Sequence, residues 1–276
     1  MLTGKIFSIE EFSIYDGDGI RMTLFLKGCP LRCEWCHNPE GQKAESEVCR
    51  SLNGCLSCGK CMEGGSLSEK SIEACPKRLI RRVGEIYSVE EVARIVEKNA
   101  DILNASGGGV TFSGGEPLAQ SAFLYGCLLA LRGVTDRAVQ TTGYCDTDTF
   151  LRVLSECDSV LYDLKLINDD AHKRYTGVSN TQILKNYRLL STSGVKFVTR
   201  IPLIPTVTDT AENIEGIARF MRECGVSYAE LMPYNKLAGA KYVSLGREYV
   251  TSFDGSTEVN THIDIFKKYG IEVKIL

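Results

Sequence analysis

From residue 88 onward, short apolar runs alternate with segments whose apolar positions recur at helical spacing. The apolar runs are rich in Val, Ile, Leu and aromatic residues, which is typical of buried strands. Their sequences are GVTF, RAVQTT, SVLYDL, KFVTRI and YAELMP, and RMTLFL at 21–26 is an earlier run of the same kind. Helical patterns cover residues 117–131, 146–156, 180–193 and 209–223, and a capping box from Ser88 to Glu91 predicts another helix up to about residue 98.

Six repeats of strand and helix predict a parallel sheet, because a strand can rejoin its neighbour in parallel only after a crossover connection. The expected fold class is α/β. A partial (β/α)6 parallel barrel and a doubly wound open sheet share this alternation, so the pattern alone leaves closure open. In both architectures, functional side chains gather at the carboxyl ends of the strands.

Residues 46–84 interrupt the alternation. This segment holds five cysteines among Gly, Ser and charged residues, and it has few large apolar side chains. A segment of this composition needs a bound metal to stay folded. We therefore expect a small insert at 46–84 within a larger domain formed by residues 1–45 and 85–276.

Charge and composition narrow the function classes. The chain of 276 residues has a formal net charge of −3 and no long run of Lys or Arg, so charge gives no support for a nucleic-acid partner. The N-terminal stretch has no signal-peptide pattern, and no apolar run approaches a membrane span. We expect a cytoplasmic monomer without membrane contact. Twelve cysteines in such a chain favour metal binding over disulfides.

Three of these cysteines, Cys29, Cys33 and Cys36, follow the first strand with the spacing C-x₃-C-x₂-C. A 4Fe-4S cluster takes four ligands, commonly thiolates, so three neighbouring cysteines would leave one iron open to another ligand. The same spacing could place free thiols on one face of a buried helix. Gly28 and Pro30 favour a loop, because both residues disfavour a helix interior.

A second cysteine group lies in the insert. GCLSCGKC followed by EACP has the bacterial ferredoxin spacing of three close cysteines and a remote one before proline. This spacing would suit one auxiliary 4Fe-4S cluster. A structural zinc site is the alternative, because paired C-x₂-C cysteines also bind zinc. The proposed ligands are Cys55, Cys58, Cys61 and Cys75, and a set with Cys49 in place of Cys75 stays possible.

Other unusual residues stand at or near strand ends. Gly114 and Gly115 would allow close backbone approach to a ligand, and Glu116 could accept hydrogen bonds from an ammonium group. Asp163 and Lys165 lie two residues apart and so on one face of a strand. A glycine pair is also a common turn, and a charge pair at a rim is often only an ion pair, so neither motif is decisive alone.

Together these motifs resemble one branch of the radical S-adenosylmethionine (SAM) enzymes, the activating enzymes of glycyl radical enzymes. The similarity runs through almost the whole chain, in the segments DGDGIRMTLFLKGCPLRCEWCHNPE, NASGGGVTFSGGEPL, YDLK and LMPYNKLAGAKYVSLGREY. The resemblance implies the partial (β/α)6 barrel, a SAM-binding 4Fe-4S cluster on the first three cysteines and a ferredoxin-like insert. It also implies a cofactor site of Trp35, His37, Gly114, Gly115, Glu116, Thr142, Asp163, Lys165, Arg200 and Asn235, with Asp16 against the substrate.

The chain departs from the family pattern at three positions. Asp18 replaces a proline in the first motif, where it can still form a turn between two glycines. Gln140 stands where relatives have an acidic residue that holds a monovalent cation, so that cation is not expected here. Asn235 replaces a histidine near the SAM ribose, and its amide can form hydrogen bonds but cannot carry a proton. Trp35 and His37 could also be packing residues.

The function that the resemblance implies is activation of a partner enzyme. A flavodoxin or ferredoxin would reduce the first cluster, SAM would be cleaved, and the 5′-deoxyadenosyl radical would take a hydrogen atom from a glycine of a glycyl radical enzyme. The alternative within enzymes is a radical SAM maturase or mutase that acts on a small molecule or another protein. An electron carrier or a zinc-stapled binding module would need no SAM pocket, so the rim residues argue against it.

Overall fold

A computed structural model describes all residues from 1 to 276, and its main feature is a nine-stranded sheet in the order β11-β10-β9-β8-β7-β6-β2-β1-β5. The strands are β1 (Thr3–Ser13), β2 (Arg21–Leu26), β5 (Glu85–Ser88), β6 (Gly109–Gly114), β7 (Asp136–Thr141), β8 (Ser159–Asp163), β9 (Lys196–Leu203), β10 (Tyr228–Pro233) and β11 (Glu272–Ile275). The helices of this part are α2 (Val89–Glu97), α3 (Ala100–Ala105), α4 (Ser121–Ala130), α5 (Thr147–Leu154), α6 (Asp169–Thr176), α7 (Thr181–Thr192), α8 (Ala211–Glu223), α9 (Ala238–Ser244) and α10 (Ile263–Lys268).

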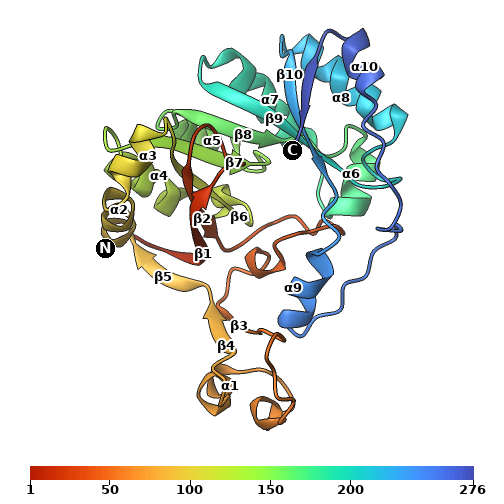
Figure 1. The fold of residues 1–276 in the computed structure, drawn as a ribbon. Coiled ribbons are helices and arrows are strands. Elements are labelled where there is room, and N and C mark those ends of the chain that lie inside the picture. The colour runs from red at the N-terminus through yellow and green to blue at the C-terminus, as the bar shows by residue number, and fades with distance from the viewer.

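The strand order decides between the two architectures that the sequence left open. From β2 through β6, β7, β8, β9, β10 and β11, each strand pairs in parallel with the next one along the chain. A doubly wound sheet would reverse its order at a switch point, and this sheet does not. Because the chain always moves to the next strand in the same direction, the connecting helices lie on one face of the sheet (Figure 1). The α/β class and the parallel sheet are confirmed, and the two edge strands β11 and β5 are not paired with each other.

All six strands predicted from the apolar runs are present, and so are the predicted helices. The capping box of α2 forms as expected, since the Ser88 hydroxyl accepts from the Glu91 N–H and the Glu91 carboxylate accepts from the Ser88 N–H. The sequence analysis did not predict β1, β5, β11, α3, α6, α9 or α10. Strand β1 pairs antiparallel with both β2 and β5, so it extends the sheet beyond the repeated strand–helix units.

The core of the main domain is one cluster of 36 buried hydrophobic residues between the sheet and its helices. The central strands contribute every second residue to it, and Leu24, Phe112, Val139 and Ile201 are among the buried side chains. The alternate positions point to the other face of the sheet, where Ser113 and Arg200 line the cavity described below. No helix is long and apolar enough to cross a membrane.

Residues 47–83 form a small unit that projects from the main sheet (Figure 1). Its strands β3 (Glu47–Arg50) and β4 (Ile80–Val83) pair antiparallel in a sheet of their own, and between them lie a 3₁₀ turn at Lys60–Met62 and helix α1 (Glu69–Ala74). At the base of this unit, Glu47 forms ion pairs with Lys27 of the main domain, at 3.1 Å, and with Arg247. The Lys27 side chain is fully buried, so this contact fixes the stem of the insert beside the end of β2.

Candidate functional site

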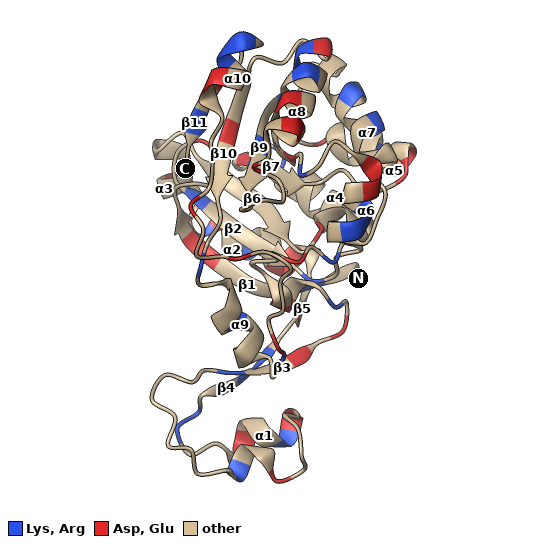
Figure 2. Cartoon of the chain, turned by 90° about the vertical axis from the view of Figure 1, so that its right-hand side faces the viewer, with Lys and Arg blue, Asp and Glu red and all other residues tan.

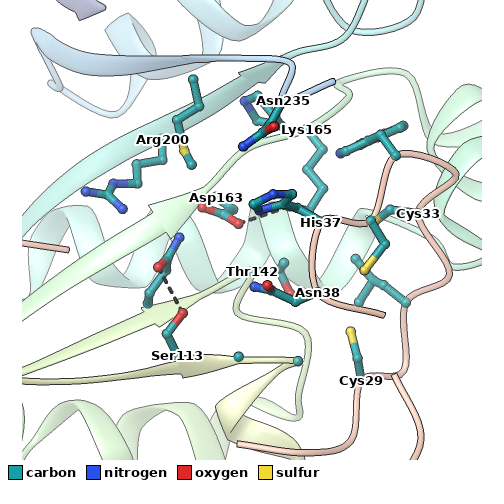
Figure 3. Close-up of a pocket in the computed structure, with 18 of the residues that line it drawn as sticks. Cys29, Cys33, His37, Asn38, Ser113, Thr142, Asp163, Lys165, Arg200 and Asn235 are labelled. Carbon is teal, nitrogen blue, oxygen red and sulfur yellow. Dashed lines mark hydrogen bonds and ion pairs between the residues drawn. The ribbon is translucent and has the colours of Figure 1, made fainter. Parts of the chain in front are cut away.

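A cavity of about 520 Å³ lies at the carboxyl ends of the parallel strands. Its volume is typical of small-ligand sites. Figure 3 shows Cys29, Cys33, Thr142, Asp163 and Arg200 around one space, although they come from distant parts of the chain. The residues proposed from the sequence that line this cavity are Asp16, Cys29, Cys33, Trp35, Cys36, His37, Gly114, Gly115, Thr142, Asp163, Lys165, Arg200 and Asn235.

The cysteines of the first motif lie in a loop, so the alternative of a helix face with free thiols is wrong. Backbone bonds close this loop at its base, where the Gly28 N–H donates to the Gly41 carbonyl at 2.8 Å and the Cys29 N–H to the Gln42 carbonyl at 3.2 Å. Gly28 has a φ of +92°, a conformation that favours glycine. The loop therefore turns back on itself and presents Cys29, Cys33 and Cys36 to the same cavity.

Burial keeps these thiols protonated when no metal is bound. It raises the pKa of Cys33 to about 12 and also raises the pKa values of Cys29 and Cys36. Metal binding by these sulfurs must therefore displace their protons. No three His, Cys, Asp or Glu side chains surround a point that would suit a single metal ion. The donor set itself, three thiols on one cavity wall, fits three corners of an iron–sulfur cube.

The glycine pair of the SGGEP segment lies directly against the cysteine loop. A Cβ at Gly115 would overlap the carbonyl oxygens of Gly28 and Gly41, and a Cβ at Gly114 would overlap the backbone of Leu26. The Gly115 N–H donates to the Leu26 carbonyl at 2.8 Å, and the Glu116 N–H donates to the Gly28 carbonyl at 2.9 Å. These glycines thus allow two backbones to meet while both still line the cavity.

Glu116 is the one proposed cofactor residue that does not line the cavity. Its side chain is completely buried, and its oxygens accept from the Thr141 hydroxyl at 2.5 Å, the Thr142 N–H at 2.8 Å and the Thr142 hydroxyl at 2.6 Å. The Leu118 N–H adds a fourth bond at 3.2 Å. Burial raises the pKa of Glu116, and these donors offset only part of that effect. The Glu116 carboxylate therefore holds the loop after β7 in place, and this loop places Thr142 on the cavity wall.

Asp163 and Lys165 form an ion pair of 2.9 Å on the cavity wall. The second carboxylate oxygen, Asp163 Oδ1, is buried without any hydrogen-bond partner. A buried acceptor left in this state suits a ligand that brings a donor, such as an ammonium or a hydroxyl group. Burial alone would lower the pKa of Lys165, but the charge and the hydrogen bond of the Asp163 carboxylate raise it.

Arg200 lies beside Asp163, because the two residues pair in register on the neighbouring strands β9 and β8, and the protein already uses part of its guanidinium. Its Nε donates to Glu230 Oε2 at 2.9 Å, another nitrogen donates to the Tyr15 carbonyl, and Nη1 lies 3.8 Å from Asp16 Oδ1. Asp16 is itself fixed by the Thr23 hydroxyl at 2.8 Å. The sequence analysis missed Glu230, an acidic residue inside an apolar strand, which pairs in register with Arg200.

Two of the three positions that depart from the family pattern, Gln140 and Asn235, have defined contacts at the cavity. Gln140 lines the cavity, and its side-chain oxygen accepts from the Ser113 hydroxyl at 2.9 Å. Asn235 is exposed at the rim, and its side-chain oxygen accepts from the Leu237 N–H at 2.9 Å, next to the start of α9. Trp35 is buried among Leu166, Ile204, Val207 and Phe253 while still facing the cavity, so it packs and lines the site at once.

The insert contains a second, much smaller cavity. Cys55, Cys58, Cys61 and Cys75 all line it. Cys49 does not, because its side chain is buried with Phe7 and Val83 at the base of the insert. Three donors already point at these sulfurs: the Ser57 N–H at Cys55 and the Leu79 N–H at Cys75, both at 3.4 Å, and the Arg50 guanidinium at Cys61, at 3.6 Å. Donors of this kind are typical around metal-bound thiolates.

Comparison with known proteins gives relatives across nearly the full chain. The radical SAM superfamily profile matches residues 23–221. The chain is 40% identical to an isethionate sulfite-lyase activating enzyme of Nitratidesulfovibrio vulgaris, covering 89% of both chains. It is 33% identical to a 4-hydroxyphenylacetate decarboxylase activating enzyme of Clostridioides difficile, covering 98% of this chain and 95% of that one. A radical SAM methyltransferase structure from Sphaerobacter thermophilus has the same fold, with a TM-score of 0.54 at 15% identity over 93% of this chain and 66% of that one.

Proposed function

Since the chain belongs to the radical SAM superfamily and, within it, to the activating enzymes of glycyl radical enzymes, we propose that it installs a glycyl radical on a partner enzyme. The observation that carries the proposal is a single cavity whose wall joins the three thiols of the first motif, a glycine pair and an unpaired aspartate oxygen. An electron carrier or a zinc module has no use for such a site.

Cys29, Cys33 and Cys36 would hold the 4Fe-4S cluster to which SAM binds. The cluster would supply the electron for reductive cleavage of SAM, which would provide the radical that removes a hydrogen atom from a glycine Cα. The loop contributes rigidity, because backbone bonds to Gly41 and Gln42 fix its two ends. Its contact with the SGGEP segment leaves little freedom between the cluster ligands and the SAM-binding wall.

The remaining wall residues would bind and orient SAM. Asp163 Oδ1 offers an unused acceptor, and Lys165 beside it carries a positive charge. Arg200, on the strand next to Asp163, offers a further positive charge and is held in position by Glu230 and Asp16. A zwitterionic ligand with an ammonium, a carboxylate and hydroxyl groups suits this mixture of charged donors and acceptors. Trp35, His37, Thr142 and Asn235 complete the proposed SAM site, and Glu116 acts through Thr142.

The partner's glycine would enter beside Asp16. This residue lies on the cavity wall near the exposed Tyr15, so a peptide that reached the cavity would pass it. One relative is named as the activating enzyme of a sulfite-lyase and the other as that of a decarboxylase. The two relatives therefore share the activation reaction but act on different partner enzymes. We assign the same reaction to this chain, acting as a cytoplasmic monomer reduced by a flavodoxin or ferredoxin.

A second 4Fe-4S cluster in the insert is part of the proposal. Cys55, Cys58, Cys61 and Cys75 share one small cavity, which supports Cys75 as the fourth ligand in preference to Cys49. Zinc is the alternative metal for four thiolates. Iron and zinc analysis of the purified protein separates the two readings, since two cubes require about eight irons per chain.

The function is tested by anaerobic mixing with SAM, a strong reductant and recombinant glycyl radical enzymes of the two kinds named by the relatives. We expect a carbon-centred radical in the partner by electron paramagnetic resonance and, with deuterated partner glycine, label in 5′-deoxyadenosine. A variant with Cys29, Cys33 and Cys36 changed to Ala serves as the inactive control. If SAM were cleaved without a protein radical while an added small molecule became labelled, the chain would be a maturase or mutase instead.

A further inference from the structure

The insert differs in charge from the rest of the molecule. Residues 46–84 contain seven Lys or Arg and four Glu, a net charge of +3 in a chain whose total is −3. Two of the four glutamates are already paired, Glu47 with Lys27 and Arg247 and Glu69 with Arg82. The projecting unit is thus a basic surface on an acidic protein, and Figure 2 shows Lys and Arg along β4 and the loop before it.

Several of the basic residues lie next to the four cysteines in the sequence or line their cavity. Lys60 stands next to Cys61, and Lys77 and Arg78 follow Cys75, all three exposed to solvent. Lys77 also lines the cavity itself. None of these three side chains forms a salt bridge within the chain, and the exposed Arg81 on β4 forms none either. Their charge is free to act on a partner.

Large apolar side chains are also exposed on the insert. Leu56 is 60% exposed, Leu52 46% and Met62 40%, and Cys58 is exposed between them in the sequence. Leu56 lines the same small cavity as the cysteines. Protein interfaces commonly have an apolar centre and a polar or charged rim. Weak electron-transfer complexes have this arrangement over a small buried area.

We propose that this face of the insert, defined by Leu56, Cys58, Lys60, Met62, Lys77 and Arg78, docks an acidic one-electron carrier protein. Charge complementarity selects the occupant, because the free cations here would attract an anionic protein and steer its approach. The step is transfer of one electron from the carrier to the cluster held by the four cysteines, with no bond made or broken. The inference rests on the proposed auxiliary cluster and adds the site at which electrons enter.

A competing entry point exists at the first cluster. Cys29 also lines a shallow groove on the outer side of its loop, together with Pro30, Arg32, Lys43 and Glu45. The charges of this groove are mixed, and Lys43 is engaged by Glu47 at 3.2 Å. A carrier that docked there would bypass the insert. The groove therefore defines the alternative that an experiment must separate.

The experiment uses the reconstituted full chain and a photoreduced flavodoxin as the probe. Lys77→Glu with Arg78→Glu reverses two charges beside the cysteines without touching the SAM cavity. The control, Lys98→Glu with Lys185→Glu, makes the same charge change at exposed positions elsewhere on the main domain. Stopped-flow bleaching of the iron–sulfur absorbance at low salt gives the rate. We expect at least about a tenfold loss for the insert variant, little change for the control, and a wild-type rate that falls with salt.

Photoreduced deazaflavin, a small reductant that needs no docking face, should reduce both variants at the wild-type rate. An insert variant that retained its iron and still accepted electrons from flavodoxin at the wild-type rate would refute the docking proposal. Equal loss in the Arg32→Glu variant alone would move the entry point to the groove beside Cys29. If the insert variant formed less glycyl radical than wild type with deazaflavin as reductant, this face would bind the glycyl radical enzyme, and the proposal would be overturned. Metal analysis tests the auxiliary cluster separately, because zinc in the insert would exclude it.

Discussion

Replacement of Asp163 by Asn tests whether the unpaired oxygen Asp163 Oδ1 binds SAM. Both carboxylate oxygens need to be acceptors: Oδ2 receives the Lys165 ammonium at 2.9 Å, and Oδ1 is buried and unpaired until a ligand donates to it. An amide has the same shape but only one acceptor oxygen. In the Asn variant, either Lys165 or the ligand must therefore face an NH₂ group, whichever way the amide is turned.

The magnitude follows from the loss of one hydrogen bond to a charged group, about 1.5–3 kcal/mol. At 25 °C this is roughly a tenfold to hundredfold weaker binding constant for SAM. The side chains of Asp163 and Lys165 are only 17% and 12% exposed, so solvent cannot replace the lost partner. The full effect should be seen in the dissociation constant.

Isothermal titration of anaerobically reconstituted protein with SAM measures that constant. Asp146→Asn is the matched control, because Asp146 caps α5 outside the cavity, where it accepts from the Thr149 N–H at 2.9 Å. The control should bind SAM as the wild type does. Iron content and the thermal midpoint show whether each variant is folded and loaded. If folded, fully loaded Asp163→Asn bound SAM within twofold of wild type, the role assigned to Oδ1 would be refuted.

Three further results are expected. Cys75→Ser should lower the iron content from about eight to about four per chain, whereas Cys49→Ser should leave it unchanged; the opposite pattern would exchange the two ligand assignments. Glu47→Gln should lower the free energy of unfolding by about 1.5–3 kcal/mol at pH 7, measured by urea titration, because the buried Lys27 loses its charged partner. Burial favours a higher pKa for Glu47, but hydrogen bonds from Arg247 and Lys27 outweigh it and lower the pKa, so this stability is present above the unfolded pKa of about 4.3 and is lost as pH falls through the folded value. A difference between Glu47→Gln and wild type that persisted unchanged down to pH 3 would contradict that account.

Much of the fold was predictable because strand and helix periods are local. Six apolar runs became β2, β6, β7, β8, β9 and β10, and the capping box of α2 forms as its spacing predicts. Candidate site residues were also predictable from their place in the chain. Parallel strands end at one edge of a sheet, so Cys29, Asp163 and Arg200 had to lie near one another. Strand β1 was not predicted, because its sequence TGKIFSIEEFS mixes Gly, Ser and charged residues with its apolar positions, yet it lies inside the sheet between β2 and β5.

The sequence by itself thus determined the fold class, the cysteine loop and most residues of the cavity wall. Only the tertiary structure decided how individual side chains are used. Glu116 turns away from the cavity to hold Thr142, Cys75 and not Cys49 shares a cavity with the other insert cysteines, and Arg200 is engaged by Glu230. Each of these outcomes depends on a contact between segments that are distant in the chain. Local spacing sets where a residue stands on its own element, but its partners are set by how the elements pack.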